Sequence, residues 1–368
     1  MKICSFCVMD TTCDGIIFNE NSRCNFCIEY EKKLKKNFND IYKFKNFNEL
    51  LDKIKKHKKK FSNKYDCIVG VSGGIDSSYT LLKVVESGLK PLAVHFDNGW
   101  NSELAQNNIE NLIKGLNVDY YTHVVRWTEY RNLMQSFFDS DVIDVELLTD
   151  NAISAVNFKI ASKENIPFIL AGTNYSTEGM SMPKNMNWFK YDKKNIVSIH
   201  KKFVKSEFNS YPLIGLIDFI YYFFFKKIRW INFLDFFDYN KQEAERVLSE
   251  KYGYKTYHNK HYESVFTRFY QGYILLEKFK IDKRILHYST LIVNGQMTRM
   301  EALKKLSQPT YQSKEEFIND KNFFLKKMNW EEKDLDGYLK RKEIKHDYYP
   351  SNRGLFEFLI KIYKKITL

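Results

Sequence analysis

The sequence predicts an α/β fold with a parallel sheet and helices on both of its faces, and two kinds of pattern predict it. Between residues 66 and about 202, short β-branched runs alternate with stretches at helical spacing. Such alternation is typical of a parallel sheet covered by helices. Before this block the chain holds four closely paired cysteines, and after it the sequence is mostly helical and aromatic. We therefore expect modules at residues 1–45, 46–205 and 206–368.

Length and charge leave several classes of function open. With 368 residues the chain can bury a large core in two or three domains. Its net charge of +13 comes from 58 Lys and Arg residues against 45 Asp and Glu residues. Most of the basic residues are lysines interleaved with Asn, Ile, Phe and Tyr, a composition that AT-rich genomes also produce. Charge alone therefore does not indicate a nucleic-acid partner.

The N-terminal cysteines predict a structural zinc site. Two C-x-x-C pairs, CSFC and CNFC, supply Cys4, Cys7, Cys24 and Cys27. Two such pairs can close a tetrahedral thiolate site, which leaves no open position for a catalytic water. A disulfide framework is the alternative, but no secretory signal precedes these pairs, and we expect a cytoplasmic protein.

The stretch GVSGGIDSS at residues 70–78 predicts a phosphate-binding turn. It follows the first of four predicted strands, at residues 66–71, 91–97, 120–125 and 167–171, and precedes a helix over residues 76–85. The free N–H groups at a helix N-terminus bind anions, and glycine lets the backbone approach them closely. The spacing matches neither the Walker loop nor the dinucleotide fingerprint.

The pattern S-G-G-x-D-S resembles the loop of the ATP pyrophosphatases, the group that includes asparagine, GMP and NAD synthetases, argininosuccinate synthetase and tRNA thiolases. This resemblance implies ATP cleavage to AMP and pyrophosphate with Mg²⁺. It assigns the loop residues to ATP binding, namely Ser72, Gly73, Gly74, Asp76, Ser77 and Ser78.

Polar residues also follow two other predicted strands. The second strand ends in VHFDNGW, with His95, Asp97 and Asn98, and the fourth in AGTNYSTEG, with Gly172 and Thr173. Ligands of parallel sheets gather at these strand ends, so we expect a nucleotide there. By the same resemblance, Glu178 lies near the α-phosphate and joins Asp76 in binding Mg²⁺ and in catalysis.

The longest apolar stretch, YPLIGLIDFIYYFFF at residues 211–225, contains Asp218. It is too short for a confident membrane span. A buried helical hairpin is the ordinary interpretation, and a weak contact with a membrane surface, helped by Lys226, Lys227 and Arg229, is the alternative.

The nucleophile distinguishes the relatives of this loop. Sulfur transfer generally needs a thiol or a cluster near the nucleotide, and no cysteine follows Cys67, which disfavours tRNA thiolation. Amide transfer needs ammonia, but Lys2 stands where a built-in glutaminase has its cysteine. Ammonia must then come from solution or from a separate partner.

Longer motifs carry a more specific resemblance. CSFCVMDTT, TDNAISA, AGTNYSTEG, DYNKQEA, KHYESVFTRFYQGYILLEKFKIDKR and STLIVNGQMTR, between residue 4 and about residue 305, resemble the N-acetyl sugar amidotransferases of surface-polysaccharide (O-antigen) and nonulosonic-acid biosynthesis. That family implies an ATP-dependent conversion of a sugar acetamido group to an acetamidino group, with ammonia from a glutaminase and cyclase-like pair.

The same resemblance implies a set of sugar-binding residues within residues 260–284, a segment rich in polar side chains. They are Lys260, His261, Glu263, Thr267, Arg268, Lys283 and Arg284. Arg268 is the strongest candidate and is also assigned to catalysis, because its planar fork suits a carboxylate or phosphate. A tRNA-modifying adenylyltransferase or thiolase of the same superfamily is the alternative function, and we expect no specific nucleic-acid partner.

Overall fold

A computed structural model of the chain describes residues 2–34, 46–61, 63–204, 206–258 and 260–367. The predicted module boundaries at residues 45 and 205 lie outside the described residues.

The centre of the fold is a five-stranded parallel sheet in the order β3-β2-β1-β4-β5. Four strands confirm the prediction: β1 (Cys67–Gly70), β2 (Pro91–Asp97), β3 (Asp119–Val124) and β4 (Phe168–Ala171). The fifth, β5 (Arg229–Asn232), is not predicted and lies beyond the expected limit of the α/β module. It is an edge strand of four residues inside a long aromatic stretch, so no alternation of apolar and polar residues marks it.

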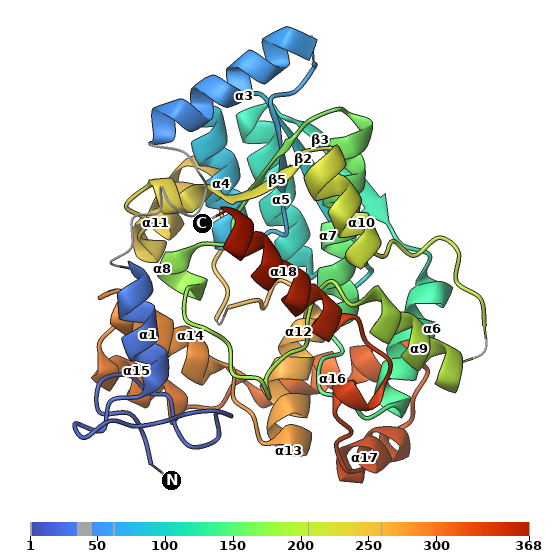
Figure 1. Cartoon of the computed structure of the whole chain (residues 1–368). Coiled ribbons are helices and arrows are strands. Elements are labelled where there is room, and N and C mark those ends of the chain that lie inside the picture. Colours follow the sequence, from blue (N-terminus) through green and yellow to red (C-terminus); the bar gives the residue numbers. More distant parts are fainter. Residues whose placement is uncertain (1, 35–45, 62, 205, 259, 368) are drawn as a thin grey trace.

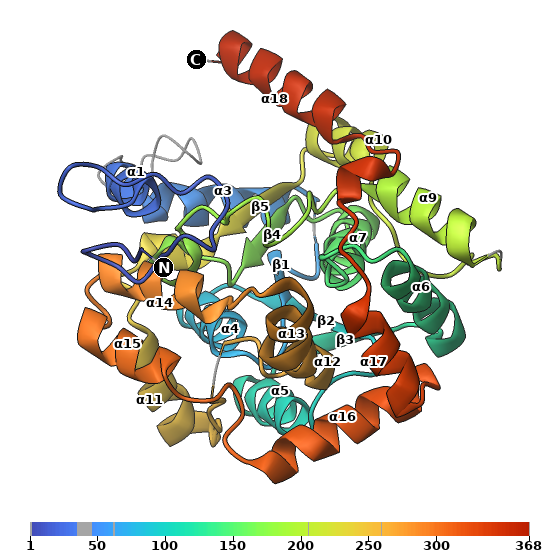
Figure 2. The ribbon, with the colours of Figure 1, turned by 90° about the horizontal axis from the view of Figure 1, so that it is seen from below.

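Alternate strand residues point into two different cores. Cys67 and Val69 of β1 pack in the core that includes residues of α3 (Phe47–Phe61), α4 (Ile75–Glu86) and α5 (Glu103–Leu116). Ile68 of β1 and Val94 of β2 pack on the other side, with α6 (Trp127–Asp139) and α7 (Leu147–Lys163). Because both of their faces are buried, β1, β2 and β4 are mostly apolar, whereas the edge strand β3 is partly exposed. Figures 1 and 2 show these helices around the sheet.

Helices dominate the rest of the chain. After β4 come α8 (Tyr175–Glu178), α9 (Lys193–Phe203), α10 (Leu216–Ile220) and the π-helical turn η1 (Tyr221–Phe225). After β5 the elements are η2 (Phe233–Phe236), α11 (Lys241–Tyr252), α12 (Val265–Phe269), η3 (Tyr270–Ile274), α13 (Leu275–Phe279), α14 (Arg284–Val293), α15 (Arg299–Leu306), α16 (Lys314–Met328), α17 (Glu332–Lys340), η4 (His346–Tyr348) and α18 (Arg353–Thr367). These elements confirm the predicted helical C-terminal region.

The N-terminal cysteine module consists of irregular chain and α1 (Asn25–Leu34). Single β-bridges, Ile3 with Asp10 and Phe18 with Cys24, hold its turns. In sequence the module is far from α14 and α15, yet α1 packs on α14, and Figure 1 shows the three helices together at the lower left.

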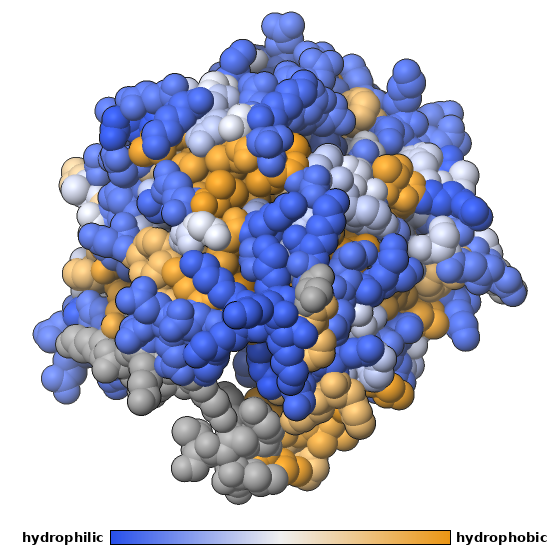
Figure 3. Space-filling model, turned by 90° about the horizontal axis from the view of Figure 1, so that it is seen from above, coloured by the Kyte–Doolittle hydropathy of each residue, from blue (hydrophilic) through white to orange (hydrophobic). Residues whose placement is uncertain are grey.

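The aromatic stretch at residues 211–225 does not form a buried hairpin. Its outer face is exposed at Ile217 (82%) and Phe225 (75%), and Phe219 packs on Phe356 of α18 with ring centroids 5.4 Å apart. Figure 3 shows hydrophobic side chains at the lower edge of the molecule, on the side from which α18 projects. None of the helices in the described ranges is long and apolar enough to cross a membrane. A contact with a membrane surface stays a prediction.

Candidate functional site

The S-G-G-x-D-S loop connects β1 to α4, as its sequence predicts. Gly73 has φ +82°, and a Cβ there would lie 2.7 Å from the carbonyl oxygen of Ala105, so the turn requires glycine. The Ser72 hydroxyl accepts from the Gly74 N–H at 3.2 Å and lies 3.1 Å from the Ser77 hydroxyl. No side chain caps the helix at Gly74. The first N–H groups of α4 are therefore available to a ligand.

A cavity of about 420 Å³ lies at this carboxyl edge of the sheet. Most residues predicted for ATP and sugar binding line it: Ser72, Gly74, Asp76, Ser77, His95, Asn98, Gly172, Thr173, Glu178, Lys260, His261, Glu263, Thr267 and Lys283. The structure thus brings the ends of β1, β2 and β4 together with a segment that lies nearly 200 residues after the loop.

Asp76 and Glu178 face each other across one lysine. The Lys260 amine lies 3.0 Å from Asp76 Oδ2 and 2.9 Å from Glu178 Oε1, and it donates to the Thr177 hydroxyl at 2.9 Å. The Tyr239 hydroxyl donates to Asp76 Oδ1. Burial would raise the pKa of Asp76, but Lys260, Tyr239 and Lys241 outweigh burial and hold this pKa below its ordinary value. Asp76 is therefore ionised at neutral pH.

These two carboxylates suit a magnesium ion bound together with phosphates. Mg²⁺ in such sites takes one or two carboxylates, phosphate oxygens and water. Lys260 occupies the position between the carboxylates. The two carboxylates fit the ion's preference for oxygen donors.

Close backbone packing places Glu178. A Cβ on Gly172, which follows β4, would lie 2.7 Å from the Ser77 nitrogen, so the chain passes directly over the start of α4. The Asn174 side chain then accepts from the Thr177 N–H at 2.9 Å and begins α8, which ends at Glu178. This geometry brings Glu178 to the cavity.

His95 is held neutral at the end of β2. Its Nδ1 donates to the carbonyl oxygen of Val71 at 2.8 Å, and its Nε2 accepts from the Asn101 amide at 2.8 Å. Burial lowers the pKa of His95. Its neighbour Asp97 accepts from the Gly99 N–H and does not line the cavity. The hydroxyl of Thr173, which follows β4, donates to Asn232 Oδ1 of β5 at 2.6 Å.

Four other predicted residues stand apart from the cavity lining. The guanidinium of Arg268 binds Asp320, at 2.5 and 2.6 Å, and Glu316, at 3.1 Å. Arg284 binds Asp282 at 2.8 Å and lines a neighbouring small cavity. Gly73 shapes the loop from behind, and Ser78 is fully buried in α4. The structure therefore does not bring Arg268 to the expected sugar site.

Several lining residues escape the sequence analysis. They are Lys241, Glu146, Gln271, Tyr254 and His287. Glu146 lies 2.7 Å from the Lys283 amine, and Gln271 donates to both of its oxygens. The motif DYNKQEA contains both Tyr239 and Lys241. It contributes to the family resemblance, but the sequence alone assigns neither residue a role.

The four paired cysteines form one compact cluster. Their sulfur atoms all lie within 4.8 Å of one another, with separations of 3.8 Å (Cys4 to Cys27), 3.6 Å (Cys7 to Cys24) and 3.6 Å (Cys24 to Cys27). A tetrahedral ion with metal–sulfur bonds of about 2.3 Å places its sulfur atoms about 3.8 Å apart. The backbone N–H of Cys24 also points at Cys4 Sγ, at 3.2 Å. The cluster therefore fits one tetrahedral metal ion.

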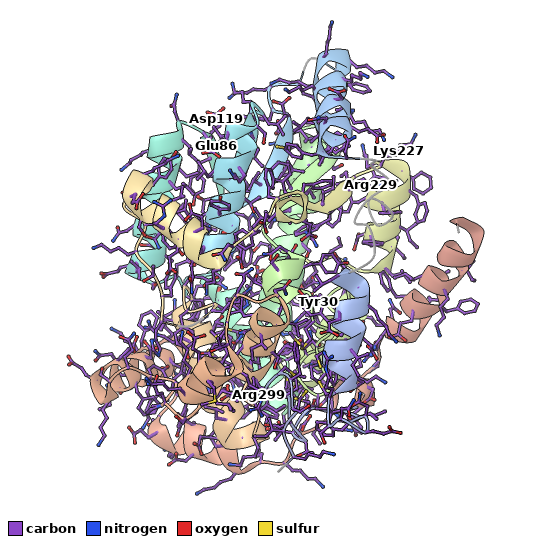
Figure 4. All side chains as sticks on the ribbon, turned by 90° about the vertical axis from the view of Figure 1, so that its left-hand side faces the viewer. Tyr30, Glu86, Asp119, Lys227, Arg229 and Arg299 are labelled. Atoms are coloured by element: carbon purple, nitrogen blue, oxygen red, sulfur yellow. The ribbon has the colours of Figure 1, made fainter. Side chains whose placement is uncertain are left out.

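The cysteine module is joined to the rest of the molecule at two labelled residues of Figure 4. The Arg299 guanidinium donates to the carbonyl oxygens of Cys4 and Cys7, each at 3.1 Å. The Tyr30 hydroxyl donates to the carbonyl oxygen of Tyr175, the first residue of α8, and accepts from Asn294. The module thus supports the short helix that ends at Glu178.

The helices opposite the nucleotide loop form one wall of the cavity, and they belong to a segment that matches a protein family. Residues 263–366 match the family described as "LPS biosynthesis protein WbpG-like, C-terminal domain". This match supports the resemblance to amidotransferases of surface-polysaccharide biosynthesis. The WbpG-like segment contributes Glu263, Thr267, Gln271, Lys283 and His287 to the cavity. No curated protein matches the chain.

Several solved structures match the chain at low similarity. A 4-thiouridine synthetase in complex with RNA and ATP is 18% identical, with a TM-score of 0.31, over 51% of this chain and 41% of that protein. The NH3-dependent NAD synthetase of Campylobacter jejuni is 17% identical (TM-score 0.28; 41% and 69% covered). The U34-tRNA thiolase NcsA of Methanococcus maripaludis, with its [4Fe-4S] cluster, is 14% identical (TM-score 0.30; 84% and 90% covered).

Proposed function

We propose that the chain is an ATP-dependent amidotransferase that converts the acetamido group of a sugar to an acetamidino group in surface-polysaccharide biosynthesis. One observation carries the proposal: a single cavity has the S-G-G-x-D-S loop on one side and the WbpG-like segment on the other. The S-G-G-x-D-S loop suits a nucleoside triphosphate, and the WbpG-like segment would hold the sugar. We place this activity in the cytoplasm, because the reaction needs ATP.

Two steps would make up the reaction. The acetamide oxygen attacks the α-phosphorus of ATP, a new P–O bond forms, and the bond to pyrophosphate breaks. Ammonia then adds to the carbon of the O-adenylyl imidate, loses a proton, and AMP leaves with the oxygen. An amide carbonyl is a poor electrophile and its oxygen a poor leaving group, and adenylylation removes both obstacles.

The residues of the chain would divide this work. Ser72, Ser77 and the N-terminus of α4 would hold the departing pyrophosphate, and Lys260 would balance the charge that develops on it. Asp76 and Glu178 would hold a magnesium ion, which supplies charge neutralisation on the phosphates when bound. His95, neutral and fixed by Val71 and Asn101, would position the nucleotide.

The sugar would lie against Lys260, His261, Glu263, Thr267 and Lys283. Burial lowers the pKa of His261, but Glu263 and Glu178 outweigh burial and raise it. A protonated His261 next to Lys260 suits a substrate with an anionic group. Arg268 and Arg284, which are occupied by carboxylates, would act by fixing the helices around this site. Ammonia would come from solution or from a separate glutaminase and cyclase-like pair.

The cysteine cluster would bind zinc and stabilise the N-terminal module. A [4Fe-4S] cluster attaches each thiolate to a different iron atom, so its cysteines stand farther apart than the 3.6–3.8 Å separations found here. Metal analysis of the purified protein should give about one zinc per chain. A finding of iron, or of no metal, would contradict this assignment.

The alternative is a tRNA-modifying enzyme of the same superfamily. Sulfur transfer lacks an accessible thiol, since Cys67 and Cys13 are both buried and the four paired cysteines are enclosed in their cluster. We therefore expect RNA binding to be weak, non-specific and strongly dependent on salt.

Incubation with ATP, Mg²⁺, ammonium and a panel of acetamido sugars tests the proposal directly. The expected result is AMP together with a sugar product one mass unit lighter, and the product should need ammonium. ADP and phosphate as products would overturn the pyrophosphatase assignment. Tight, site-specific tRNA binding without any ammonium-dependent sugar product would favour the alternative.

A further inference from the structure

A second cavity, of about 80 Å³, lies beside the main one and shares five lining residues with it, namely Lys241, Lys260, Gln271, Lys283 and His287. Side chains from α11, α14 and α15 enclose it. Its lining is strongly basic: Lys241, His258, Lys260, Lys283, Arg284, His287 and Lys305 face a single lining carboxylate, Asp282. The reaction proposed above gives Lys260 and Lys283 a role, but none to Lys241, Lys305 or His287.

Carboxylates neutralise only part of this positive charge. Asp76 and Glu178 pair with Lys260, Glu146 pairs with Lys283 at 2.7 Å, and Asp282 pairs with Arg284 at 2.8 Å. For Lys241 and Lys305, in contrast, no carboxylate of the described chain lies within ion-pair distance.

Burial and neighbouring cations together lower the pKa of two lining groups. Burial lowers the pKa of Lys241, and Lys260 and Lys305 lower it further, although Asp76 and Glu245 act in the opposite direction. Burial also lowers the pKa of His287 well below its ordinary value, and His261, Lys260, Lys283 and Lys241 add to that effect. Neighbouring cations that disfavour one another's charged forms make a site where an anion would be stabilised.

We infer that the small cavity is a binding site for a phosphoryl oxyanion, held by Lys241 and Lys305, with His287 as a further hydrogen-bonding partner. A phosphoryl group carries close to two negative charges near neutral pH and three acceptor oxygens. It therefore matches two amines that have no ion-pair partner among the described residues better than a single carboxylate does.

Two sources could supply this phosphoryl group. Because the cavity borders the main one through Lys241 and Lys260, it lies within reach of the phosphates of ATP and also of a phosphate carried by the acceptor sugar. Both sources would present the same phosphoryl group, and a competition experiment distinguishes ATP from the acceptor sugar. The identity of the occupant rests on the proposed function, whereas binding of inorganic phosphate can be tested without it.

Binding of inorganic phosphate to the full-length protein, measured by calorimetry at low salt, tests the inference. Lys241→Gln should weaken binding by about tenfold or more, since a charge-assisted hydrogen bond in a buried site is lost. Lys305→Gln should weaken binding by about threefold, because Lys305 is exposed at the rim. Lys304→Gln is the matched control: it removes the same charge from the next residue of α15, outside the cavity lining, and should leave binding unchanged.

The second arm adds a non-hydrolysable ATP analogue. If phosphate still binds, the acceptor supplies the phosphoryl group; if the analogue excludes phosphate, ATP supplies it. Lys241→Arg, which keeps the charge, should retain most of the binding and shows that the loss in Lys241→Gln is not a folding defect. No phosphate binding by the wild-type protein at millimolar concentration, or equal binding by Lys241→Gln and wild type, would overturn the inference.

Discussion

Two buried ion-pair clusters lie close together in the sequence but have different surroundings. Lys260 pairs with Asp76 and Glu178, and Arg268 pairs with Asp320 and Glu316. Burial does not distinguish them, since the two cationic side chains are 13% and 18% exposed. Lys260 and its partners line the main cavity beside the nucleotide loop, whereas Arg268 lies outside that lining. A charged cluster becomes a candidate site through the space it borders.

The largest expected effect comes from the cavity cluster. Asp76→Asn keeps the shape of the side chain but removes its charge, so AMP formation should fall by about 10²–10³-fold, as expected when a preorganised electrostatic group is lost from an active site. Steady-state AMP release measures the effect. Metal content and thermal unfolding should stay close to wild type. A variant with normal AMP formation would remove Asp76 from the site.

Arg268→Ala should show the reverse pattern. Removing the guanidinium leaves Asp320, which is 5% exposed, without its partner, and the free energy of unfolding should fall by about 3 kcal/mol. Chemical denaturation measures this loss, and turnover per folded molecule should change little. Arg246→Ala is the matched control, because that arginine also binds two carboxylates, Glu243 and Glu250, but on the exposed face of α11. We expect little change in its stability. A collapse of sugar turnover in a stable Arg268→Ala protein would return Arg268 to the binding site.

A titratable side chain outside the cavity gives a smaller effect. Burial lowers the pKa of His346 to about 4, although Asp144 acts to raise it. The unfolded chain binds a proton near pH 6.5 and the folded chain only near pH 4, so stability falls as the pH drops through this window. The loss at pH 5 relative to pH 8 is about 2 kcal/mol. His346→Gln should flatten that part of the curve of unfolding free energy against pH. An unchanged slope would show that other groups cause it.

The smallest effect tests remote support of the cavity cluster. Tyr30→Phe removes the hydroxyl that contacts Tyr175 at the start of α8 and should cost about 1 kcal/mol of stability. Because α8 carries Glu178, the KM for ATP should rise about two- to threefold while metal content is unchanged, as a difference of a few tenths of a kcal/mol implies. Equal KM values in the variant and wild type would show that α8 keeps its position without this contact.

Local patterns predicted much of the fold. The β-branched runs, the S-G-G-x-D-S turn and the cysteine pairs each depend on neighbouring residues, so their positions were predictable. The strand β5 was not, because a four-residue edge strand at Arg229–Asn232 is defined by its pairing with β4 and not by its own sequence.

The site was predictable where it follows from strand ends, and less so where it depends on distant packing. Ser72, His95 and Glu178 line the cavity because parallel strands end at one edge. Lys241 and His287 reach it only through the packing of α11 and α14, which no local spacing reveals. Arg268 illustrates the converse: its fork suits an anionic substrate, but Asp320, 52 residues later in the chain, already occupies it.

The hydrogen bonds between Arg299 and the cysteine module can form only late in the synthesis of the chain. Arg299 and Cys4 are 295 residues apart, so at 5–20 residues per second the ribosome adds the arginine roughly 15–60 s after the cysteine. During that interval the nascent module lacks α14 and α15, on which it later docks. A metal ion bound by the four cysteines would then join the two β-bridges in constraining its turns. Metal capture would therefore be an early event in the life of the chain, and docking a late one.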